Sequence, residues 1–596
     1  MKLIKYKNKK NFSKKFRSKI LIISLLKKKN NLSKYPTIYL NEGCLPSRLI
    51  NDFNRKSVPN YLHLRKKNLY KNYFYLLRIY EYFLRILSNK LNKIHSVNYS
   101  INYWRVLIGV WLFEFISIIF DNWSKLKYIN NNYSLRYTEV ARVKDSDFLF
   151  KNYNDFAYKS LTDTFNNSVY NDLLKFFKRN KINYFINKKK YLDDNIYSEK
   201  ISNSLLNIFK IFFILVSNFF QKDKNAFFHE TYFDKKTLFF LQIKLNQIPT
   251  LYKSINIDNK IFYNKKIRSQ EFKNLKDPFG KILTHLIFKY IPLSYLENYN
   301  YYLKKIKTIN WPKKPKFIFS SNSFFHDDFF KFWLAEKKEI FKTKFIAGQH
   351  GGYFSTNRFS FLEKHLNDIS DLIITWGYDK KKFKSVFNFK TLNKEIKFNN
   401  NGKLLFIDYV LIRFSGTHDA YLRFSYLTYL EDQINFIRKL NKNIINELIF
   451  RKYPFTHGWK INLIHLIKKK IKVNVLIDKN KKIHDTLKES RLCFINLNST
   501  VYLETLNLNF PTIIFFNTDN DEINNEAKKY LNILKKVGIY FDDHEMAAKK
   551  INEIWDNVEG WWYGKLVQNA VKVFCDRFSK RSNKSSLNKL YNLLIK

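Results

Sequence analysis

Short apolar runs alternate with helical stretches from about residue 315 onward, and this alternation constrains the fold of the 596-residue chain more than any other feature. Because short buried strands separated by helices build parallel βαβ units, we predict an α/β fold with parallel sheets. The polar stretch 379–401 divides the runs into two arrays and indicates two domains. The runs are 317–319, 344–347, 372–375, 403–407, 447–450, 473–477, 492–496 and 512–516.

The first half of the chain has a different pattern. Segments 70–89, 104–123 and 201–220 are long and apolar with almost no Gly or Pro, which predicts helices, and 37–40 is the one early strand-like run. The most apolar stretch, 106–120, is interrupted by Glu114, and 211–220 is far shorter than the roughly 20 residues that span a bilayer. We therefore predict no transmembrane helix.

The termini are basic. The first 36 residues carry 13 Lys or Arg and no acid, so we expect a disordered basic arm over 1–36. The predicted units that follow are a helix-rich α/β domain over 37–395, a second α/β domain over 396–555, and C-terminal helices with a basic tail over 556–596. The arm and the 577–596 tail leave open a peripheral contact with an anionic inner-membrane surface.

The net charge of +57, from 107 basic and 50 acidic side chains, suggests a polyanionic partner. We discount it, because Lys, Asn, Ile, Phe and Tyr are all enriched while Gly and Pro are scarce, a skew typical of AT-rich coding. The basic residues are spread along the whole chain without a nucleic-acid-binding module, so no nucleic-acid partner is expected. Binding to a polyanion or nucleic acid is kept as the non-enzymatic alternative.

No known cofactor or metal motif is present. The three cysteines are far apart, which fits a reducing cytoplasm and gives neither a disulfide framework nor a metal-ligand spacing. The chain lacks a Walker A motif, a G-x-G-x-x-G and a G-x-S-x-G. Asp519 and Asp521 form an Asp-x-Asp pair in a polar loop, which we interpret as solvated, so no metal site is predicted.

Glycine placement marks a first candidate site. The chain has only 13 Gly, yet three of them lie within 348–352, directly after the run 344–347. A chain that avoids Gly retains it where the backbone needs positive φ or a close approach to a ligand. His350 lies on this turn, and with an ordinary pKa of about 6.5 it would suit removal of a proton from a hydroxyl. Gln349, Gly351 and Gly352 are the expected substrate-binding neighbours.

A second candidate site follows the run 492–496. Ser499 and Thr500 begin a predicted helix whose free amides and dipole would bind phosphate, and Glu504 lies one turn later, where it could accept hydrogen bonds from ribose hydroxyls. Arg451 follows the run 447–450 and offers a bidentate fork to phosphate. Arg413 is a weaker candidate of the same kind.

Taken together, these motifs resemble those of a family of transferases encoded in bacterial O-antigen and surface-polysaccharide clusters, first noted in Leptospira. More distantly, the Gln-His-Gly turn and the Ser-Thr-x-x-x-Glu pattern are similar to capsule and teichoic-acid transferases of GT-B architecture. The match spans roughly residues 37–580. The matching pieces are LNKIH (91–95), NYWR (102–105), GQHGGY (348–353), TWG (375–377), RKY (451–453), GW (458–459), NST (498–500) and PT (511–512).

The resemblance implies a GT-B-like α/β fold with two Rossmann-like domains facing a cleft and a helix-rich N-terminal half. It implies an acceptor side on 37–395 and a donor-binding domain over 396–555. It implies a nucleotide-activated sugar as donor substrate, without an obligatory metal or further cofactor. His350 is then the expected base, and Arg451, Ser499, Thr500 and Glu504 are the expected donor-site residues.

The predicted function is a glycosyltransferase that moves a sugar from a nucleotide-activated donor to an O-antigen- or capsule-type acceptor. Its expected partners are a nucleotide sugar and a glycan or lipid-linked glycan, at the cytoplasmic side of the inner membrane. A phosphotransferase of teichoic-acid type, acting on a CDP-polyol, would use a similar fold and turn. The sequence leaves these two enzymatic alternatives open.

Overall fold

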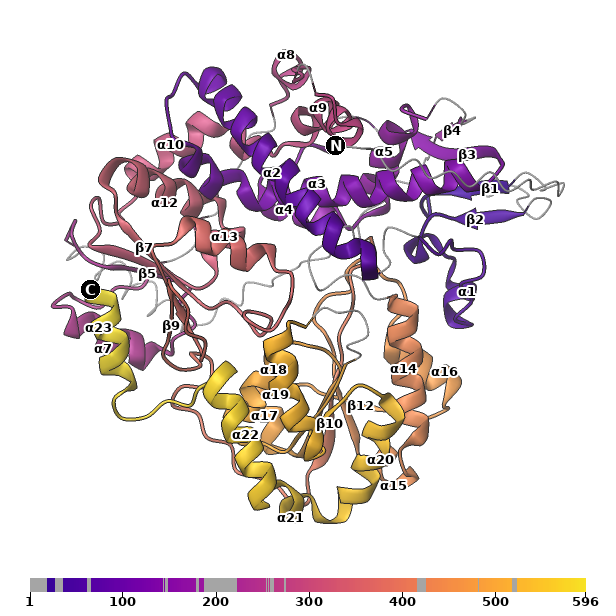
Figure 1. Ribbon diagram of the computed structural model, residues 1–596, viewed down its shortest axis with the longest axis vertical. Coiled ribbons are helices and arrows are strands. Elements are labelled where there is room, and N and C mark those ends of the chain that lie inside the picture. The colour runs from indigo at the N-terminus through magenta and orange to yellow at the C-terminus, as the bar shows by residue number, and fades with distance from the viewer. Residues whose placement is uncertain are drawn as a thin grey trace.

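The structure is a computed structural model. It describes residues 19–26, 36–61, 66–142, 144, 148–177, 182–186, 222–252, 255, 257, 262–272, 275–414, 425–480, 482–516 and 523–596. Three parallel sheets form its framework: one lies at the upper left, one at the upper right and one in the lower part of the molecule (Figure 1).

The lower sheet has six parallel strands in the order β12-β11-β10-β13-β14-β15. Counted from β10, this order is 3-2-1-4-5-6, the Rossmann order, in which the winding reverses between the first and fourth strands. Both faces are covered, one by α14, α16 and α20 and the other by α18, α19 and α22, which explains why the strands are continuously apolar. The strands are β10 (Lys403–Ile407), β11 (Leu448–Arg451), β12 (Leu476–Ile477), β13 (Ser490–Ile495), β14 (Thr512–Phe515) and β15 (Tyr540–Phe541).

The upper-left sheet has five parallel strands whose order follows the chain, β5-β6-β7-β8-β9. Helices α12 and α13 cover one face, and the last helix of the chain, α23, lies near the other beside α7 (Figure 1). The prediction of two parallel α/β arrays after residue 315 is confirmed. The strands β5 and β9 were not predicted, and β9 lies within the polar stretch 379–401 that was expected to separate the arrays. The strands are β5 (Phe227–His229), β6 (Phe317–Ser320), β7 (Lys344–Gly348), β8 (Leu372–Thr375) and β9 (Phe383–Ser385).

The upper-right sheet was not predicted. It consists of β1 (Lys19–Ile22), β2 (Thr37–Tyr39), β3 (Leu135–Arg142) and β4 (Ile182–Ile186), all parallel, in the order β2-β1-β3-β4. The expectation of a disordered arm over 1–36 is therefore wrong for 19–26, where β1 is a central strand and Ile20 and Leu21 have no exposed surface. A short apolar run between lysines is long enough to form a strand that lies between two neighbouring strands, here β2 and β3. Residues 1–18 and 27–35 lie outside the described residues.

The predicted long helices are confirmed as α2 (Lys66–His95) and α3 (Ile101–Asn132), which run across the top of the molecule (Figure 1). By length and composition α3 could cross a membrane, but 89% of its most apolar window is buried inside the protein. It contacts α2, α5, α9, α12 and α13, so it serves as the central helix of the upper half. The predicted helix over 201–220 lies outside the described residues.

The other helices connect and cover the sheets. They are α1 (Ser47–Asn51), α4 (Tyr153–Lys159), α5 (Asp163–Leu174), α7 (Lys235–Lys244), α8 (Lys265–Arg268), α9 (Pro278–Tyr290), α10 (Tyr299–Thr308), α11 (Ser323–His326), α12 (Asp328–Phe341), α13 (Phe361–Ile369), α14 (Tyr426–Lys439), α15 (Lys442–Asn446), α16 (Leu463–Lys470), α17 (Ile483–Lys488), α18 (Thr500–Asn507), α19 (Asn525–Lys536), α20 (His544–Ile554), α21 (Val558–Trp562), α22 (Lys565–Phe578) and α23 (Ser586–Ile595).

The upper-left and lower halves touch where the glycine turn after β7 meets the start of α18. The Gly352 N–H donates to Thr500 Oγ1 at 3.1 Å, and a Cβ at Gly352 would lie 2.4 Å from the carbonyl oxygen of Ser499. At Gly351 a Cβ would meet Thr500 Oγ1 at 3.0 Å. Neither glycine has positive φ, so the close approach of α18 is what disfavours side chains here, through the Ser499 backbone at Gly352 and the Thr500 hydroxyl at Gly351.

The C-terminal residues also join the two halves. Helix α22 packs on α18 and α19 in the lower half, and α23 then returns to α7 in the upper half (Figure 1). At the crossing, the Lys580 N–H donates to the carbonyl of Trp376 at 2.6 Å, and a Cβ at Gly377 would lie 2.6 Å from the backbone of Arg577. The predicted basic tail is thus a packed helix for much of its length.

A third link between the lower half and the N-terminal part of the chain is the buried Arg413. Its guanidinium donates to the carbonyl of Gly43 at 2.8 and 2.9 Å, to the carbonyl of Gly458 at 3.1 Å, and to both carboxylate oxygens of Asp163 at 2.8 and 3.0 Å. The side chains of Arg413 and Asp163 are 5% and 11% exposed. The arginine therefore connects three separate segments through one planar group.

We predict that Arg413→Met destabilises the fold by about 3–5 kcal/mol, because it leaves the buried Asp163 carboxylate without its partner. Urea unfolding followed by circular dichroism measures the change. Arg438→Met, at the exposed end of α14, is the matched control and should unfold as the parent does. Parental stability of Arg413→Met would show that the buried pair does not hold the segments together.

We also predict that Gly352→Ala lowers the free energy of unfolding by about 1–3 kcal/mol, and that Gly351→Ala lowers it less. The new methyl group at 352 would meet the Ser499 carbonyl, which is fixed in the backbone, whereas at 351 it meets the side-chain oxygen of Thr500, which can shift by rotation about the Cα–Cβ bond. Thermal unfolding of the two variants side by side gives the comparison. Equal or reversed effects would contradict the close backbone contact.

Candidate functional site

Polar side chains gather at the carboxyl ends of the upper-left strands, where parallel sheets bind ligands. Glu230 and Tyr232 follow β5, Ser321 follows β6, and His350 follows β7. Because β5, β6 and β7 are hydrogen-bonded neighbours, these residues share one edge of the sheet. The start of α18, at the carboxyl end of β13 in the lower sheet, faces this edge through the Gly352–Thr500 contact.

His350 is held in one ring orientation. Its Nδ1 lies 3.3 Å from the carbonyl oxygen of Ser321 and 3.1 Å from Tyr232 Oη. Since a carbonyl can only accept, the bond to Ser321 places the proton on Nδ1 and leaves Nε2 unprotonated. Among the described residues, none hydrogen-bonds Nε2, so this nitrogen is available to accept a proton.

The pKa of His350 is lowered to about 4, first by burial and then by the positive charge of Lys390. The ordinary value near 6.5 that the sequence suggested is therefore wrong. The imidazole is neutral at pH 7, which is the form that a general base requires.

A carboxylate–histidine pair lies beside His350. His326 Nε2 is 3.0 Å from Glu230 Oε2; burial and this pairing act in opposite directions, and the net effect lowers the pKa of Glu230 to about 2 and raises that of His326. Glu230 and Tyr232 have φ values of 45° and 64°, an uncommon backbone conformation for residues other than glycine and one that clusters at functional sites. Sequence reasoning missed these residues, because none belongs to a recognisable motif.

Gln349 shapes the turn rather than facing solvent. Its Oε1 accepts from the Trp376 N–H at 2.9 Å, its Nε2 donates to the Gly351 carbonyl at 3.0 Å, and the residue is only 2% exposed. The GQHGG and TWG motifs are thus joined by one side chain. Its predicted contact with substrate stays a prediction, and the structure gives it a positioning role.

On the lower half, β13 leads into α18 next to the point where the sheet reverses its winding, between β10 and β13. Ser499 holds the N-cap position, but its hydroxyl makes no cap bond, and its buried Oγ has no hydrogen-bond partner within the described part of the chain. The hydroxyl of Thr500 instead accepts from Gly352. Within the described residues Ser499 does not cap α18, so the first amides of the helix keep the capacity to bind an anion.

Glu504 lies one turn into α18, with a side chain that is 13% exposed. Burial raises its pKa, although Lys390 and Lys394 act in the opposite direction. Lys390 Nζ is 3.8 Å from Glu504 Oε1 and 4.6 Å from the ring centre of Tyr232, whose hydroxyl contacts His350. A continuous set of contacts therefore runs from the glycine turn to α18, and Lys390 is a member that sequence reasoning missed.

The two predicted arginines are engaged by protein groups. The five contacts of Arg413 use all its N–H donors, so Arg413 is a structural residue here and offers none to a phosphate. Arg451 Nη1 pairs with the buried Asp478 and also donates to the carbonyl of Asn480 at 3.1 Å. A role of Arg451 at a donor phosphate stays a prediction.

Asp408 is a further residue at the reversal point, directly after β10. Burial raises its pKa to about 7, although the Tyr409 N–H and the Tyr429 hydroxyl bond to the carboxyl group. Burial therefore favours the neutral form of this carboxyl group. Its position was not predicted, because a single Asp after a strand carries no sequence signal.

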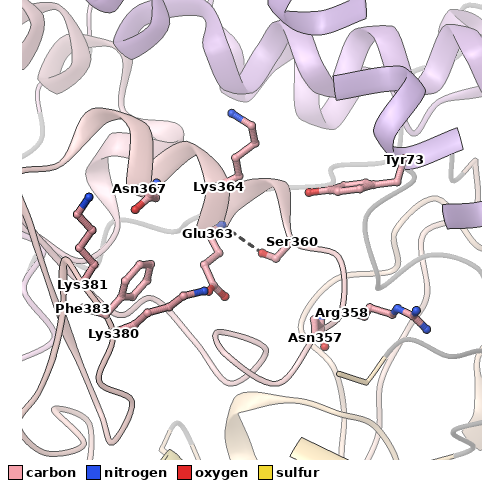
Figure 2. Close-up of a pocket in the computed structure, with 10 residues that line it drawn as sticks. All are labelled: Tyr73, Asn357, Arg358, Ser360, Glu363, Lys364, Asn367, Lys380, Lys381 and Phe383. Atoms are coloured by element: carbon pink, nitrogen blue, oxygen red, sulfur yellow. Dashed lines mark hydrogen bonds between the residues drawn. The ribbon is translucent and has the colours of Figure 1, made fainter. Parts of the chain in front are cut away.

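A cavity of about 400 Å³ lies near the site, and Figure 2 shows its polar lining. Lys364 pairs with Glu81 at 3.1 Å and Asp368 at 2.5 Å, and the Glu363 carboxylate accepts from the Ser355 N–H at 3.0 Å. His350, Thr500 and Glu504 do not line the cavity, so the chemistry described above lies outside it. The lining residues are Tyr73, Asn357, Arg358, Ser360, Glu363, Lys364, Asn367, Lys380, Lys381 and Phe383.

Comparison with solved structures finds glycosyltransferases at low overall similarity. The crystal structure of MurG from Acinetobacter baumannii is 10% identical, with a TM-score of 0.29, over 59% of this chain and 86% of that chain. The spinosyn rhamnosyltransferase SpnG is 10% identical, with a TM-score of 0.27, over 50% of this chain and 77% of its own. The calicheamicin glycosyltransferase CalG4 is 11% identical, with a TM-score of 0.27, over 50% and 82%. Such scores are too low to carry an argument about function.

No curated protein matches the chain. The family comparison is decisive by contrast, because the pattern of the LIC12162 family transferase matches residues 19–594. This range includes β1 and extends into α23, and it contains the glycine turn and the start of α18. The resemblance found in the sequence motifs is confirmed: the chain belongs to the LIC12162 family of transferases.

Proposed function

We propose that this transferase is a glycosyltransferase that moves a sugar from a nucleoside-diphosphate donor to a hydroxyl of a surface glycan. One observation carries the proposal: the turn with His350 directly contacts the start of α18, through the 3.1 Å bond from Gly352 to Thr500. A proton acceptor and an anion-binding helix start are thereby next to each other. Transfer from a phosphate-activated donor to a hydroxyl needs both.

In the proposed reaction, His350 Nε2 accepts the proton of the acceptor hydroxyl. The hydroxyl oxygen forms a bond to the anomeric carbon, and the bond from that carbon to the donor phosphate breaks. Its electron pair stays on the departing nucleoside diphosphate, next to the amides at the start of α18. A bound diphosphate also raises the pKa of His350 from about 4, because a nearby negative charge favours the protonated ring.

The finer assignment rests on the family resemblance. The motifs shared with surface-polysaccharide transferases support an acceptor of O-antigen or capsule type. This acceptor would be a glycan or a lipid-linked glycan, and the transfer would take place at the cytoplasmic side of the inner membrane. The proposed donor-site residues are Ser499, Thr500 and Glu504, and neither a metal nor a further cofactor has a role in the proposed step. A peripheral contact with anionic lipid belongs to the same proposal.

We predict that nucleoside diphosphates raise the melting temperature of the parent protein, and that EDTA does not abolish the effect. The physical reason is that helix amides and side chains would bind the phosphate. A thermal-shift assay measures the change in melting temperature with the sugar conjugates of UDP, GDP, ADP, CDP and dTDP, and with CDP-glycerol and CDP-ribitol.

Ser499→Ala combined with Thr500→Ala should weaken the shift. A response to CDP-polyols alone would instead select the phosphotransferase alternative. Loss of binding on chelation, restored by Mn²⁺, would contradict metal independence.

We predict that His350→Ala lowers kcat by about 10² to 10⁴-fold with little change in donor affinity, because the variant lacks the proton acceptor. His465→Ala, on the exposed face of α16, is the control and should retain parental activity.

The pH profile adds a second test. A lowered pKa keeps the imidazole neutral above about pH 4, so kcat/KM of the parent should show no inflection near 6.5 from this group. An inflection near 6.5 that disappears in His350→Ala would contradict the low pKa. Parental kcat in the variant would remove His350 from the mechanism.

A further inference from the structure

We propose that Lys390 is a donor-site residue whose ammonium group receives the negative charge of the departing phosphate. The inference rests on the proposed function and adds a residue that neither the sequence motifs nor the family match assigns. It starts from the location of Lys390, which lies on the connection between β9 in the upper half and β10 in the lower half.

The ammonium group lies near residues of both halves. Lys390 Nζ lies 4.6 Å from the ring centre of Tyr232, which contacts His350 at 3.1 Å. On the other side it lies 3.8 Å from Glu504 Oε1 on α18. The cation is therefore between the proton acceptor and the helix that would bind the donor.

The contact between Lys390 and Glu504 is loose. A separation of 3.8 Å is longer than a hydrogen bond, and the lysine side chain keeps 28% of its surface exposed. An arginine in a buried pair, such as Arg413 with Asp163, is held by several short bonds and cannot turn toward a ligand. A lysine on a flexible four-carbon stem can do so.

A bound donor would give the lysine a better partner. If the ribose hydroxyls bind Glu504, the phosphates lie toward Ser499 and Thr500, about 6 Å back along α18 at the helix rise of 1.5 Å per residue. That shift is within the swing of the lysine stem. Lys390 would then leave Glu504 for the phosphate oxygens, and Glu504 would be free to accept from the ribose.

In the proposed step the lysine supplies positive charge at the phosphate oxygen and takes no part in proton transfer. As the bond from the anomeric carbon to the phosphate oxygen breaks, the electron pair stays on that oxygen. Lys390 stays protonated throughout and donates hydrogen bonds to it, while the acceptor proton goes to His350. A charge-assisted bond of this kind is about twice as strong as a neutral one.

The two arginines that the sequence predicted to bind phosphate, Arg413 and Arg451, are engaged by other groups in the described structure. The donors of Arg413 are all used by Gly43, Gly458 and Asp163, and Arg451 pairs with Asp478. Lys394, the other lysine that acts on Glu504, donates its amine to the carbonyl of Lys390. Among these four described basic residues, Lys390 is the one that lies near both Tyr232, the partner of His350, and Glu504 on α18.

The test compares Lys390→Met with Lys384→Met by calorimetric titration of UDP, GDP, CDP, ADP and dTDP, each beside its nucleoside. Lys384 lies on the exposed side of β9, six residues earlier, and is the matched control. We expect Lys390→Met to weaken the nucleoside diphosphate that the parent binds by about 10- to 100-fold, with a much smaller effect on the nucleoside. Lys384→Met should bind both as the parent does.

A second readout separates charge from shape. Removing the ammonium should raise the pKa of the His350 ring, measured by NMR titration, whereas Lys390→Arg should keep the low value and part of the affinity. Parental diphosphate affinity in Lys390→Met, or equal losses for diphosphate and nucleoside, would overturn the inference while the proposed function stands. A parent that binds none of the five diphosphates would overturn the proposed function, and this inference with it.

Discussion

The contact between two backbone segments, Gly352 after β7 and Ser499 before α18, is the constraint on which the rest of the site depends. A single methyl group at residue 352 would lie 2.4 Å from the Ser499 carbonyl oxygen, so the two halves can approach this closely only with glycine there. The same principle applies on the other side of the turn, where a Cβ at Gly348 would lie 2.1 Å from Ser321 Oγ. Glycine is retained here in a glycine-poor chain because Ser499 packs against the turn at Gly352 and Ser321 packs against it at Gly348.

Burial determines much of the electrostatics of the site. It shifts both His350 and Glu504 toward their neutral forms: the pKa of the histidine falls and that of the glutamate rises. The site therefore has a neutral imidazole at His350, a carboxyl group at Glu504 with a raised pKa, and a loosely held lysine, Lys390. The ammonium group of Lys390 next to α18 favours an anionic ligand, while the negative charge of Glu230 is paired with His326.

The distribution of basic residues follows the geometry of each side chain. Arginine, with its planar fork, is found at Arg413 and Arg451, where several oxygens are bound at once. Lysine, with a flexible stem and a point charge, lies at Lys390 where the two halves meet. The net charge of +57 therefore says little about the site, since the position of one lysine among 107 basic residues is what counts.

The sequence by itself determined the α/β class, most strands after residue 315, the long helices α2 and α3, and the two segments that carry the site. These features follow from local patterns: apolar runs of strand length, uninterrupted apolar helices, and glycines clustered in a glycine-poor chain. Only the tertiary structure decided that β1 is a central strand, because Ile20, Leu21 and Ile22 become buried only once β1 lies between β2 and β3. It also decided that Arg413 is a structural joint, that Lys390 belongs to the site, and that the pKa of His350 is low. Each of these depends on contacts between residues far apart in the chain, and burial by distant segments has no signature in a local pattern of residues.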